Sequence, residues 1–186
     1  MMMDPKKINP KAVLSHISNA KNQMILPDQY AQYAHDYFSE KVAELYPKYQ
    51  AALKKNNALD FDDILLQTAI LFQTHPEVLL EYQEKFKFIS VDEYQDTNKV
   101  QYIIIGLLAQ KYRNICVIGD EDQSIYSWRG ATIQNILDFE KDYPDAKVVV
   151  LEQNYRSTQV ILDGAHDIIT KNSQRKEKKL WTEKKG

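Results

Sequence analysis

The sequence lacks the features that mark several common classes of protein. It has one cysteine among 186 residues, Cys116, which excludes an internal disulfide and fits a reducing compartment. Its longest mainly apolar stretch, YIIIGLLA at 102–109, is far shorter than the roughly 20 residues of a membrane-spanning helix. The first residues, MMMDPKK, lack the hydrophobic region of a signal peptide. We therefore expect a soluble, cytoplasmic protein with no membrane partner.

The composition is that of a folded domain. Hydrophobic residues make up 44% and charged residues 27% of the chain, which excludes a disordered or collagen-like protein. The net charge of −2 is unevenly spread, because basic residues prevail in 1–57 and 171–186 and acidic residues in 58–170. Basic ends are compatible with nucleic-acid binding, but solvated helices would show the same pattern. Charge alone therefore identifies no partner.

The first third of the chain has a helical pattern. Residues 10–57 are expected to be helical, and Pro27 followed by Asp28 is a plausible helix start. Tyr30, Tyr33 and Tyr37 recur at helical spacing. Such a stripe could stack on bases, but it more often packs against a neighbouring helix, and we favour burial.

Strands and helices alternate in the remainder of the chain, which predicts an α/β protein with a parallel sheet. Helices are expected at 59–72, capped near Asp60, from Pro76 to 85, and at 97–111, 132–143 and 157–171. Strands are expected at 85–91, 114–119 and 146–151, and the second is apolar enough to be buried on both faces. A polar segment follows each strand. Ligands of parallel sheets bind at the carboxyl ends of the strands, where these segments would lie.

Two acids, Asp92 and Glu93, directly follow the first predicted strand. Carboxylates at the end of a buried strand are costly unless something pairs with them. A chemically sensible division is that Asp92 holds a hard cation such as Mg²⁺ and Glu93 polarises a nucleophilic water. This is the arrangement of a Walker B strand in a nucleotide hydrolase. Two solvated surface acids are the alternative.

The segment GDEDQSIYSWRGA at 119–131 follows the second predicted strand. In an extended loop Tyr126 and Trp128 would face the same way, beside Arg129, and would form a platform on which single-stranded bases stack. Alternatively, Trp128 anchors a core. Gln123 could contact a phosphate or cap a turn.

Arg156, in the segment NYRST, follows the third predicted strand. Its planar guanidinium could grip a phosphate, although a lone arginine at such a place is more often a salt-bridge partner.

Taken together, VDEYQDTN, GDEDQSIYSWRGA and LEQNYRST resemble, in that order, motifs II, III and IV of superfamily-one DNA helicases of the UvrD/Rep/PcrA type. The segments SNAKN at 18–22, DFDDILL at 60–66 and NSQRKEKKLWTE at 172–183 also resemble that family. The resemblance covers essentially the whole chain.

The resemblance implies a role for each candidate residue. Asp92 matches the acid associated with Mg²⁺, and Glu93 matches the general base for ATP hydrolysis. Gln123 and Arg156 match the residues that contact the γ-phosphate of ATP. The residues that match the DNA-binding group of the family are Tyr126, Trp128 and Arg129.

The resemblance also makes one absence informative. Helicases of this type carry a P-loop, G-x-x-x-x-G-K-[ST], but none of the five glycines here is followed by lysine. The chain is therefore expected to be an internal piece of a longer motor. Residues 1–57 would belong to helical subdomain 1B, 58–147 to the first RecA-like domain (1A) and 148–186 to the second (2A). A sheet that lacks the P-loop strand would expose an apolar edge, so we expect the piece to self-associate.

Three functions follow from these observations. The first is part of an ATP-dependent 3′-to-5′ DNA helicase, inactive by itself and dependent on the missing parts of the motor. The second is a stand-alone, non-enzymatic protein that binds single-stranded DNA or a protein partner. The third, which we rank lowest, is a metal-dependent nuclease that uses the acids at 92, 93, 120 and 122.

Overall fold

A computed structural model describes residues 8–172 and 178–185, without the side chain of Arg129. The helices are α1 (Pro10–Asn22), α2 (Tyr37–Lys55), α3 (Phe61–Thr74), α4 (Pro76–Lys85), α5 (Lys99–Ala109), α6 (Gln134–Asp142) and α7 (Gln159–Ile169). The strands are β1 (Ile89–Val91) and β2 (Ile115–Val117), and short 3₁₀ turns lie at Tyr30–Tyr33, Tyr94–Asp96, Glu121–Gln123 and Ser127–Arg129. Across the described ranges, none of these helices is both long and apolar enough to cross a bilayer.

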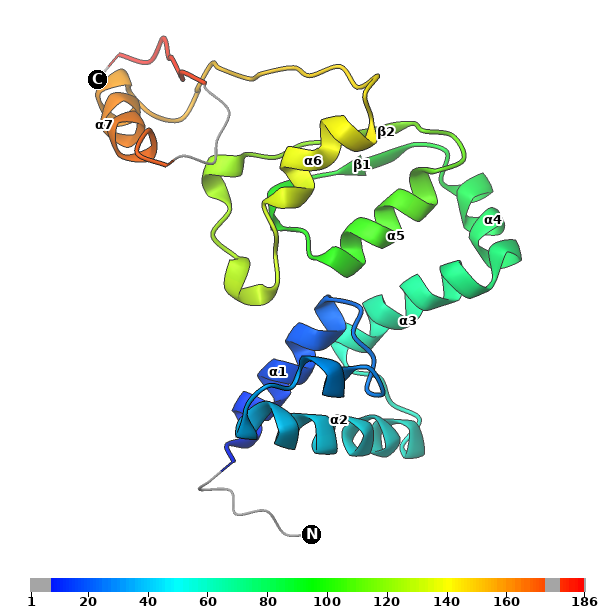
Figure 1. The fold of residues 1–186 in the computed structure, drawn as a ribbon. Coiled ribbons are helices and arrows are strands. Elements are labelled where there is room, and N and C mark those ends of the chain that lie inside the picture. The colour runs from blue at the N-terminus through cyan, green and yellow to red at the C-terminus, as the bar shows by residue number, and fades with distance from the viewer. Residues whose placement is uncertain (1–7, 173–177, 186) are drawn as a thin grey trace.

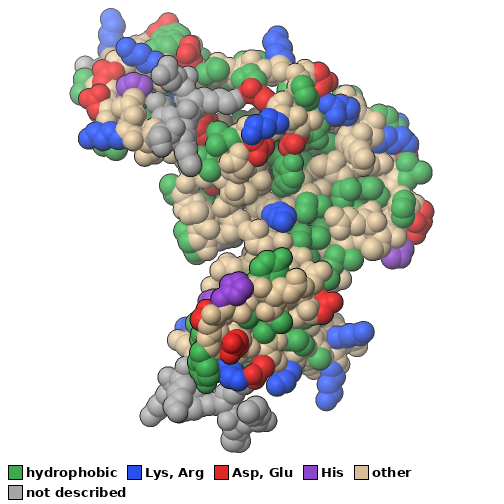
Figure 2. All heavy atoms as spheres, in the orientation of Figure 1, with side chains coloured by type: hydrophobic (Ala, Val, Ile, Leu, Met, Phe, Trp, Pro, Cys, Tyr) green, Lys and Arg blue, Asp and Glu red, His purple; other side chains and the backbone are tan. Residues whose placement is uncertain are grey.

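The elements form a helical part and an α/β part (Figure 1). Helices α1 and α2 make up the helical part, and α3 leads from it to α4 and packs against α5 in the α/β part. A long segment without secondary structure then runs from α6 to α7 (Figure 1). In Figure 2 acidic and basic side chains are interspersed over the α/β part on the face shown, so this face does not present charge of a single sign.

The tyrosine stripe is not one buried helix face, contrary to our expectation. Tyr30 is buried in the core between α1 and α2, whereas the exposed fractions of Tyr33 and Tyr37 are 57% and 65%. The helix begins at Tyr37 instead of near Pro27, because Asp36 and Ser39 form a capping box there. The preceding segment contains only one 3₁₀ turn, so the three rings do not share a helical register.

A buried ion cluster joins the three N-terminal helices. The Lys21 ammonium on α1 is fully buried and lies 2.6 Å from Asp60 Oδ2 and 2.8 Å from Asp63 Oδ1, at the start of α3. Tyr49 on α2 donates a hydrogen bond of 2.9 Å to Asp60. Burial by itself would raise the pKa of Asp60, but the hydrogen bonds from Lys21, the Asp63 amide and Tyr49 outweigh it and lower that pKa.

The two strands pair in parallel, as predicted. Ile89 is opposite Ile115, Ser90 opposite Cys116 and Val91 opposite Val117. Both strands are shorter than expected, and the side chains of Ser90 and Cys116 are exposed. The expectation that the second strand is buried on both faces is therefore wrong, since one face of the pair is open in the described chain.

The third predicted strand does not form. Residues 146–151 have no regular secondary structure, and the exposed fractions of the side chains at 148–151 range from 55% to 78%. The three consecutive valines at 148–150 predict a strand, but a strand also needs a partner. The pairing that does occur lies just beyond it, where Trp181 bridges to Gln153 and the Asn154 amide donates to Trp181 O at 2.7 Å.

The ion cluster gives a stability prediction. We expect Lys21→Met to lower the free energy of unfolding by about 3–5 kcal/mol, because it leaves the fully buried Asp63 carboxylate without its cation. Urea unfolding followed by circular dichroism measures this change. The control Lys41→Met removes a partly exposed pair with Glu44 and should change stability very little. Equal effects of the two variants would contradict the role given to the cluster.

Candidate nucleotide and DNA site

The acid pair lies where the sequence predicts it, directly after β1. Asp92 and Glu93 are both exposed. Glu93 adopts a left-handed backbone conformation (φ 50°), which is uncommon for a residue other than glycine. The Glu93 amide donates to Asp92 Oδ1 at 2.9 Å. The turn therefore displays two neighbouring carboxylates at the carboxyl end of the strand.

Gln95 is not among the predicted site residues, yet it contacts both polar segments. Its Nε2 donates to Glu93 Oε2 at 2.7 Å, and its Oε1 accepts from the Asp120 amide at 3.0 Å. The neighbouring Asp96 has a buried Oδ1 without a hydrogen-bond partner among the described residues. Burial and the nearby Glu93 charge raise the pKa of Asp96. The acids after β1 are thus packed against the loop that follows β2.

That loop begins with an acidic 3₁₀ turn. Asp120 caps it by accepting from the Asp122 amide at 3.0 Å, and Gln123 Nε2 donates to Asp120 Oδ2 at 2.7 Å. Gln123 therefore supports the turn in this structure, one of the two roles that the sequence allowed. The phosphate contact that the resemblance implies for Gln123 stays a prediction.

Lys178 from the C-terminal segment lies among the acids of this turn. Its Nζ pairs with Asp120, and it is 3.3 Å from Asp122 and 3.8 Å from Glu121. Burial would lower the pKa of Lys178, but the hydrogen bond to Asp120 and the charges of Glu121 and Asp122 raise it. Asp120 and Asp122, which the nuclease hypothesis needs as metal ligands, are instead paired with this lysine.

The two aromatic rings lie together, although not on an extended loop as expected. Ser127–Arg129 is a 3₁₀ turn, and the ring centroids of Tyr126 and Trp128 are 6.3 Å apart at an interplanar angle of 48°. The exposed fraction of Trp128 is 69%, so this residue is not a core anchor. Arg129, the third predicted DNA-binding residue, has a side chain outside the described part of the structure.

Polar contacts hold the far end of the aromatic loop. Ala131 forms an isolated antiparallel bridge with Asn98, and the Thr132 amide donates to Thr97 O at 3.1 Å. The Asn135 amide group donates to Thr97 O and Oγ1, at 3.1 and 3.0 Å. The loop is therefore attached at both ends to the segment that follows β1.

Asn22 at the end of α1 extends this attachment to the helical part. Asn98 Nδ2 donates to Asn22 Oδ1 at 2.7 Å. Gly130 has a left-handed conformation (φ 83°), and a Cβ atom there would lie 3.3 Å from Asn22 Cβ. The segment SNAKN contributes to the family resemblance, but the sequence gives no sign of these contacts because Asn22 is 76 positions from Asn98 and farther still from Gly130.

Arg156 is not brought to the acid pair. Its side chain is exposed, its amide donates to Asn154 Oδ1 at 2.9 Å, and its carbonyl accepts from Lys184 Nζ at 2.9 Å. Within the described ranges, these hydrogen bonds of Arg156 involve neither Asp92 nor Glu93. Its role at the γ-phosphate therefore stays a prediction.

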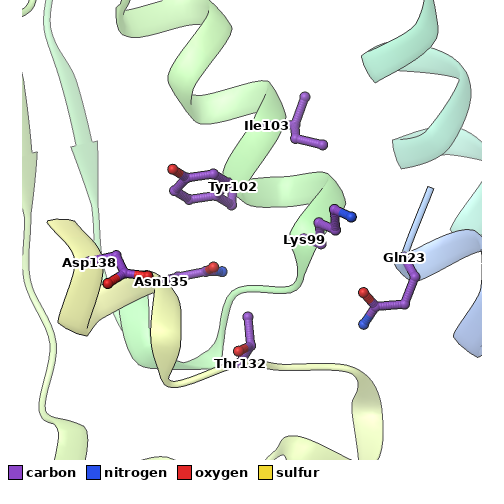
Figure 3. A pocket seen from close by; sticks show the side chains of 7 residues that line it. All are labelled: Gln23, Lys99, Tyr102, Ile103, Thr132, Asn135 and Asp138. Atoms are coloured by element: carbon purple, nitrogen blue, oxygen red, sulfur yellow. The ribbon is translucent and has the colours of Figure 1, made fainter. Parts of the chain in front are cut away.

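A cavity of about 360 Å³ lies elsewhere, between the end of α1, the start of α5 and α6 (Figure 3). Its lining residues are Gln23, Lys99, Tyr102, Ile103, Thr132, Asn135 and Asp138. No predicted site residue is among them, so the candidate chemistry lies on an open surface and not in this cavity.

The exposed acids after β1 have the chemistry of Mg²⁺ ligands, which is one requirement of an ATP–Mg²⁺ site. Mg²⁺ commonly binds one or two carboxylates together with waters and phosphates, and Asp92 suits that role. Nowhere in the described ranges do three or more His, Cys, Asp or Glu side chains form a metal-binding group. The printed sequence contains no G-x-x-x-x-G-K-[ST] loop, so this chain does not supply that phosphate cradle.

Comparison with known families confirms the family that the sequence resembles. The family model for the UvrD/REP helicase N-terminal domain matches residues 1–144. The chain belongs to this helicase family. The match includes the acid pair and the aromatic loop.

Curated relatives carry the same family identity. The chain is 54% identical to the ATP-dependent DNA helicase PcrA of Bacillus subtilis over 181 residues. It is 55% identical to that of Leuconostoc citreum and 56% identical to that of Staphylococcus aureus (strain Mu50). Each alignment covers 97% of this chain. The chain spans about a quarter of the length of these relatives.

The packing of Gly130 on Asn22 can be tested with a pair of glycine variants. Gly130→Ala should destabilise the chain by about 1–2 kcal/mol, because alanine is strained at positive φ. Gly106→Ala is the control, and it should stabilise by about 0.5–1 kcal/mol because Gly106 lies within α5 with open space around it. Thermal unfolding of both variants measures the difference, and a shift in the same direction would refute the assigned conformations.

Proposed function

We propose that the chain is a segment of an ATP-dependent DNA helicase that moves 3′ to 5′ on single-stranded DNA. The observation that carries this proposal is the contact between the two strand ends. The acid pair after β1 and the loop with Tyr126 and Trp128 after β2 are joined through Gln95. A motor that converts hydrolysis into movement on DNA must couple its hydrolytic residues to its DNA-binding residues, and these contacts offer a direct route. Membership of the UvrD/REP family and the names of the PcrA relatives support it.

The domain division follows from the same proposal. Residues 1–57 would form part of subdomain 1B, 58–147 the second half of the RecA-like domain 1A, and 148–186 the start of 2A. The parallel pair β1–β2 with its flanking helices supports a partial RecA-like sheet. The unpaired segment 148–151 is then a strand of 2A whose neighbours lie elsewhere in the motor.

In this proposal Glu93 takes a proton from the water that attacks ATP, and Asp92 holds Mg²⁺. When bound, the nucleotide and its metal supply the phosphoryl group and neutralise its charge. Gln123 and Arg156 would contact the γ-phosphate, Arg156 from the segment assigned to 2A. By itself the chain should not hydrolyse ATP, because positioning and charge stabilisation provide most of the catalysis in phosphoryl transfer.

DNA binding would occur at Tyr126, Trp128 and Arg129. The exposed Trp128 ring beside Tyr126 offers an aromatic surface to successive bases, independent of their sequence. The same surface supports a second candidate, a stand-alone protein that binds single strands or a protein partner without hydrolysis. The basic segment at the C-terminus would add a salt-dependent attraction to DNA, but residues 173–177 lie outside the described part.

The two candidates can be separated in a chimera in which this chain replaces the matching quarter of Bacillus subtilis PcrA. We expect the chimera to hydrolyse ATP in response to single-stranded DNA. Glu93→Gln should lower kcat by at least about 10²-fold, because the general base is lost. Trp128→Ala should weaken single-strand binding roughly tenfold, by loss of one stacking surface, while hydrolysis without DNA is retained. Steady-state ATPase assays and fluorescence anisotropy with labelled oligonucleotide measure these effects.

Leu59→Ala serves as the control, because Leu59 is an exposed apolar residue with no assigned role. It should leave both measurements unchanged. An inactive wild-type chimera that still binds single strands would favour the stand-alone binding protein. Full hydrolysis by Glu93→Gln would remove Glu93 from the role of base.

Self-association of the isolated chain is part of the proposal. The exposed apolar run at 148–151 and the open edges of the sheet formed by β1 and β2 can pair with another copy. Light scattering after size exclusion should give a mass above the 21.7 kDa of one chain. Val149→Lys should shift the mass toward the monomer, whereas Val160→Lys, at an exposed position on α7, should not. A clean wild-type monomer at tens of micromolar would count against self-association.

A further inference from the structure

The side-chain amide of Gln95 links the two halves of the candidate site. One end donates to the Glu93 carboxylate at 2.7 Å, and the other accepts from the Asp120 backbone at 3.0 Å. We propose that Gln95 is a positioning residue that transmits the position of the aromatic loop to Glu93. This inference rests on the proposed function, since it assigns a role within that same reaction.

The chemistry of the two partners fixes the orientation of the amide. A carboxylate only accepts and a backbone N–H only donates, so Nε2 must face Glu93 and Oε1 must face Asp120. Glutamine is the residue that presents a donor and an acceptor together at this length. The exposed fraction of Gln95 is 1%, so water does not readily replace either bond. Both bonds therefore depend on this one side chain.

The loop that follows β2 is packed tightly against the Gln95 side chain. A Cβ atom added at Gly119 would lie 2.7 Å from Gln95 Oε1, so the loop backbone passes directly over the amide. The Tyr94 amide donates to Ile118 O at 3.0 Å, which fixes the start of the loop beside Gln95. A displacement of residues 118–120 must consequently move the amide or break its bond to Asp120.

The position of the Glu93 carboxylate in turn depends on its hydrogen bond from Gln95. Glu93 is exposed and adopts an uncommon left-handed conformation, so the bond from Gln95 is a direct restraint on its carboxylate. Bases stacked on Trp128 would shift the loop that carries the Asp120 amide. Gln123 makes a different contact, because it donates to the side chain of Asp120.

The pair of hydrogen bonds made by the Gln95 side chain, here called the Gln95 bridge, can be tested in the chain itself by amide hydrogen exchange at Asp120. Gln95→Leu removes both bonds and should accelerate exchange at this amide. Gln95→Glu keeps an oxygen acceptor for the Asp120 amide, so protection should be largely retained. Assayed at alkaline pH, where its carboxyl is ionised, it cannot donate to Glu93. Gln83→Leu is the matched control, since Gln83 is a buried glutamine that bonds Leu107 O at 2.7 Å, away from the loop. It should leave Asp120 protected.

The coupling is tested in the PcrA chimera. Both Gln95 variants should lower the DNA-stimulated kcat on the order of tenfold or more, because a small misplacement of a catalytic group is costly. The KM for ATP should change less than about twofold, since Gln95 does not bind the nucleotide. Gln83→Leu should keep wild-type stimulation. If Gln95→Leu fails to fold, Gly119→Ala provides a second perturbation, because its methyl group would displace the amide.

The outcomes separate two claims: that the Gln95 bridge exists, and that it couples DNA binding to hydrolysis. Normal DNA stimulation in Gln95→Glu would overturn the coupling role, because the bond to Glu93 would then be dispensable. Equal exchange at Asp120 in wild type and Gln95→Leu would overturn the bridge itself. A wild-type chimera without DNA-dependent hydrolysis would instead refute the proposed function and with it the coupling, while the exchange data would still decide the geometry.

Discussion

The parallel pairing of β1 with β2 is the constraint on which the site depends. Parallel strands end at the same edge of a sheet, so the residues after Val91 and those after Val117 must meet there. Asp92 and Glu93 come from the first strand end, and the acidic turn with the aromatic loop comes from the second. A register shift of one residue would turn each side chain toward the opposite face and would separate these partners.

Buried polar contacts join the helical part of the chain to this edge of the sheet. The consecutive residues Lys21 and Asn22 on α1 have different partners, since Lys21 pairs with Asp60 and Asp63 on α3 while Asn22 accepts from Asn98. Helix α1 therefore ties the start of α3 to the segment after β1. These buried polar contacts fix how the elements are placed against one another. A displacement would leave a buried polar atom without its partner, which raises the free energy of the folded state.

Much of the local structure follows from the sequence. Asp60 caps α3 and Pro76 begins α4 as expected, and the acids follow a strand in a parallel pair. The predicted helix start near Pro27 is wrong, because the capping box of Asp36 and Ser39 begins α2 at Tyr37. The predicted strand at 146–151 does not form, because a strand requires a neighbour to pair with. The sequence does not predict the roles of Gln95, Asn98 and Asn22. These roles depend on tertiary contacts between residues far apart in the sequence, which periodicity and composition do not reveal.

The register of β1 and β2 is tested most directly with a disulfide. Ser90 and Cys116 are opposite each other, both exposed, and Cys116 is the only cysteine in the sequence. Neighbouring strands lie about 4.8 Å apart, within the Cα separation that a disulfide tolerates. Ser90→Cys should therefore form an intramolecular disulfide under mild oxidation of dilute protein, detected by intact mass, whereas Phe88→Cys should not. Efficient crosslinking from position 88 but not from position 90 would contradict the register and the site built on it.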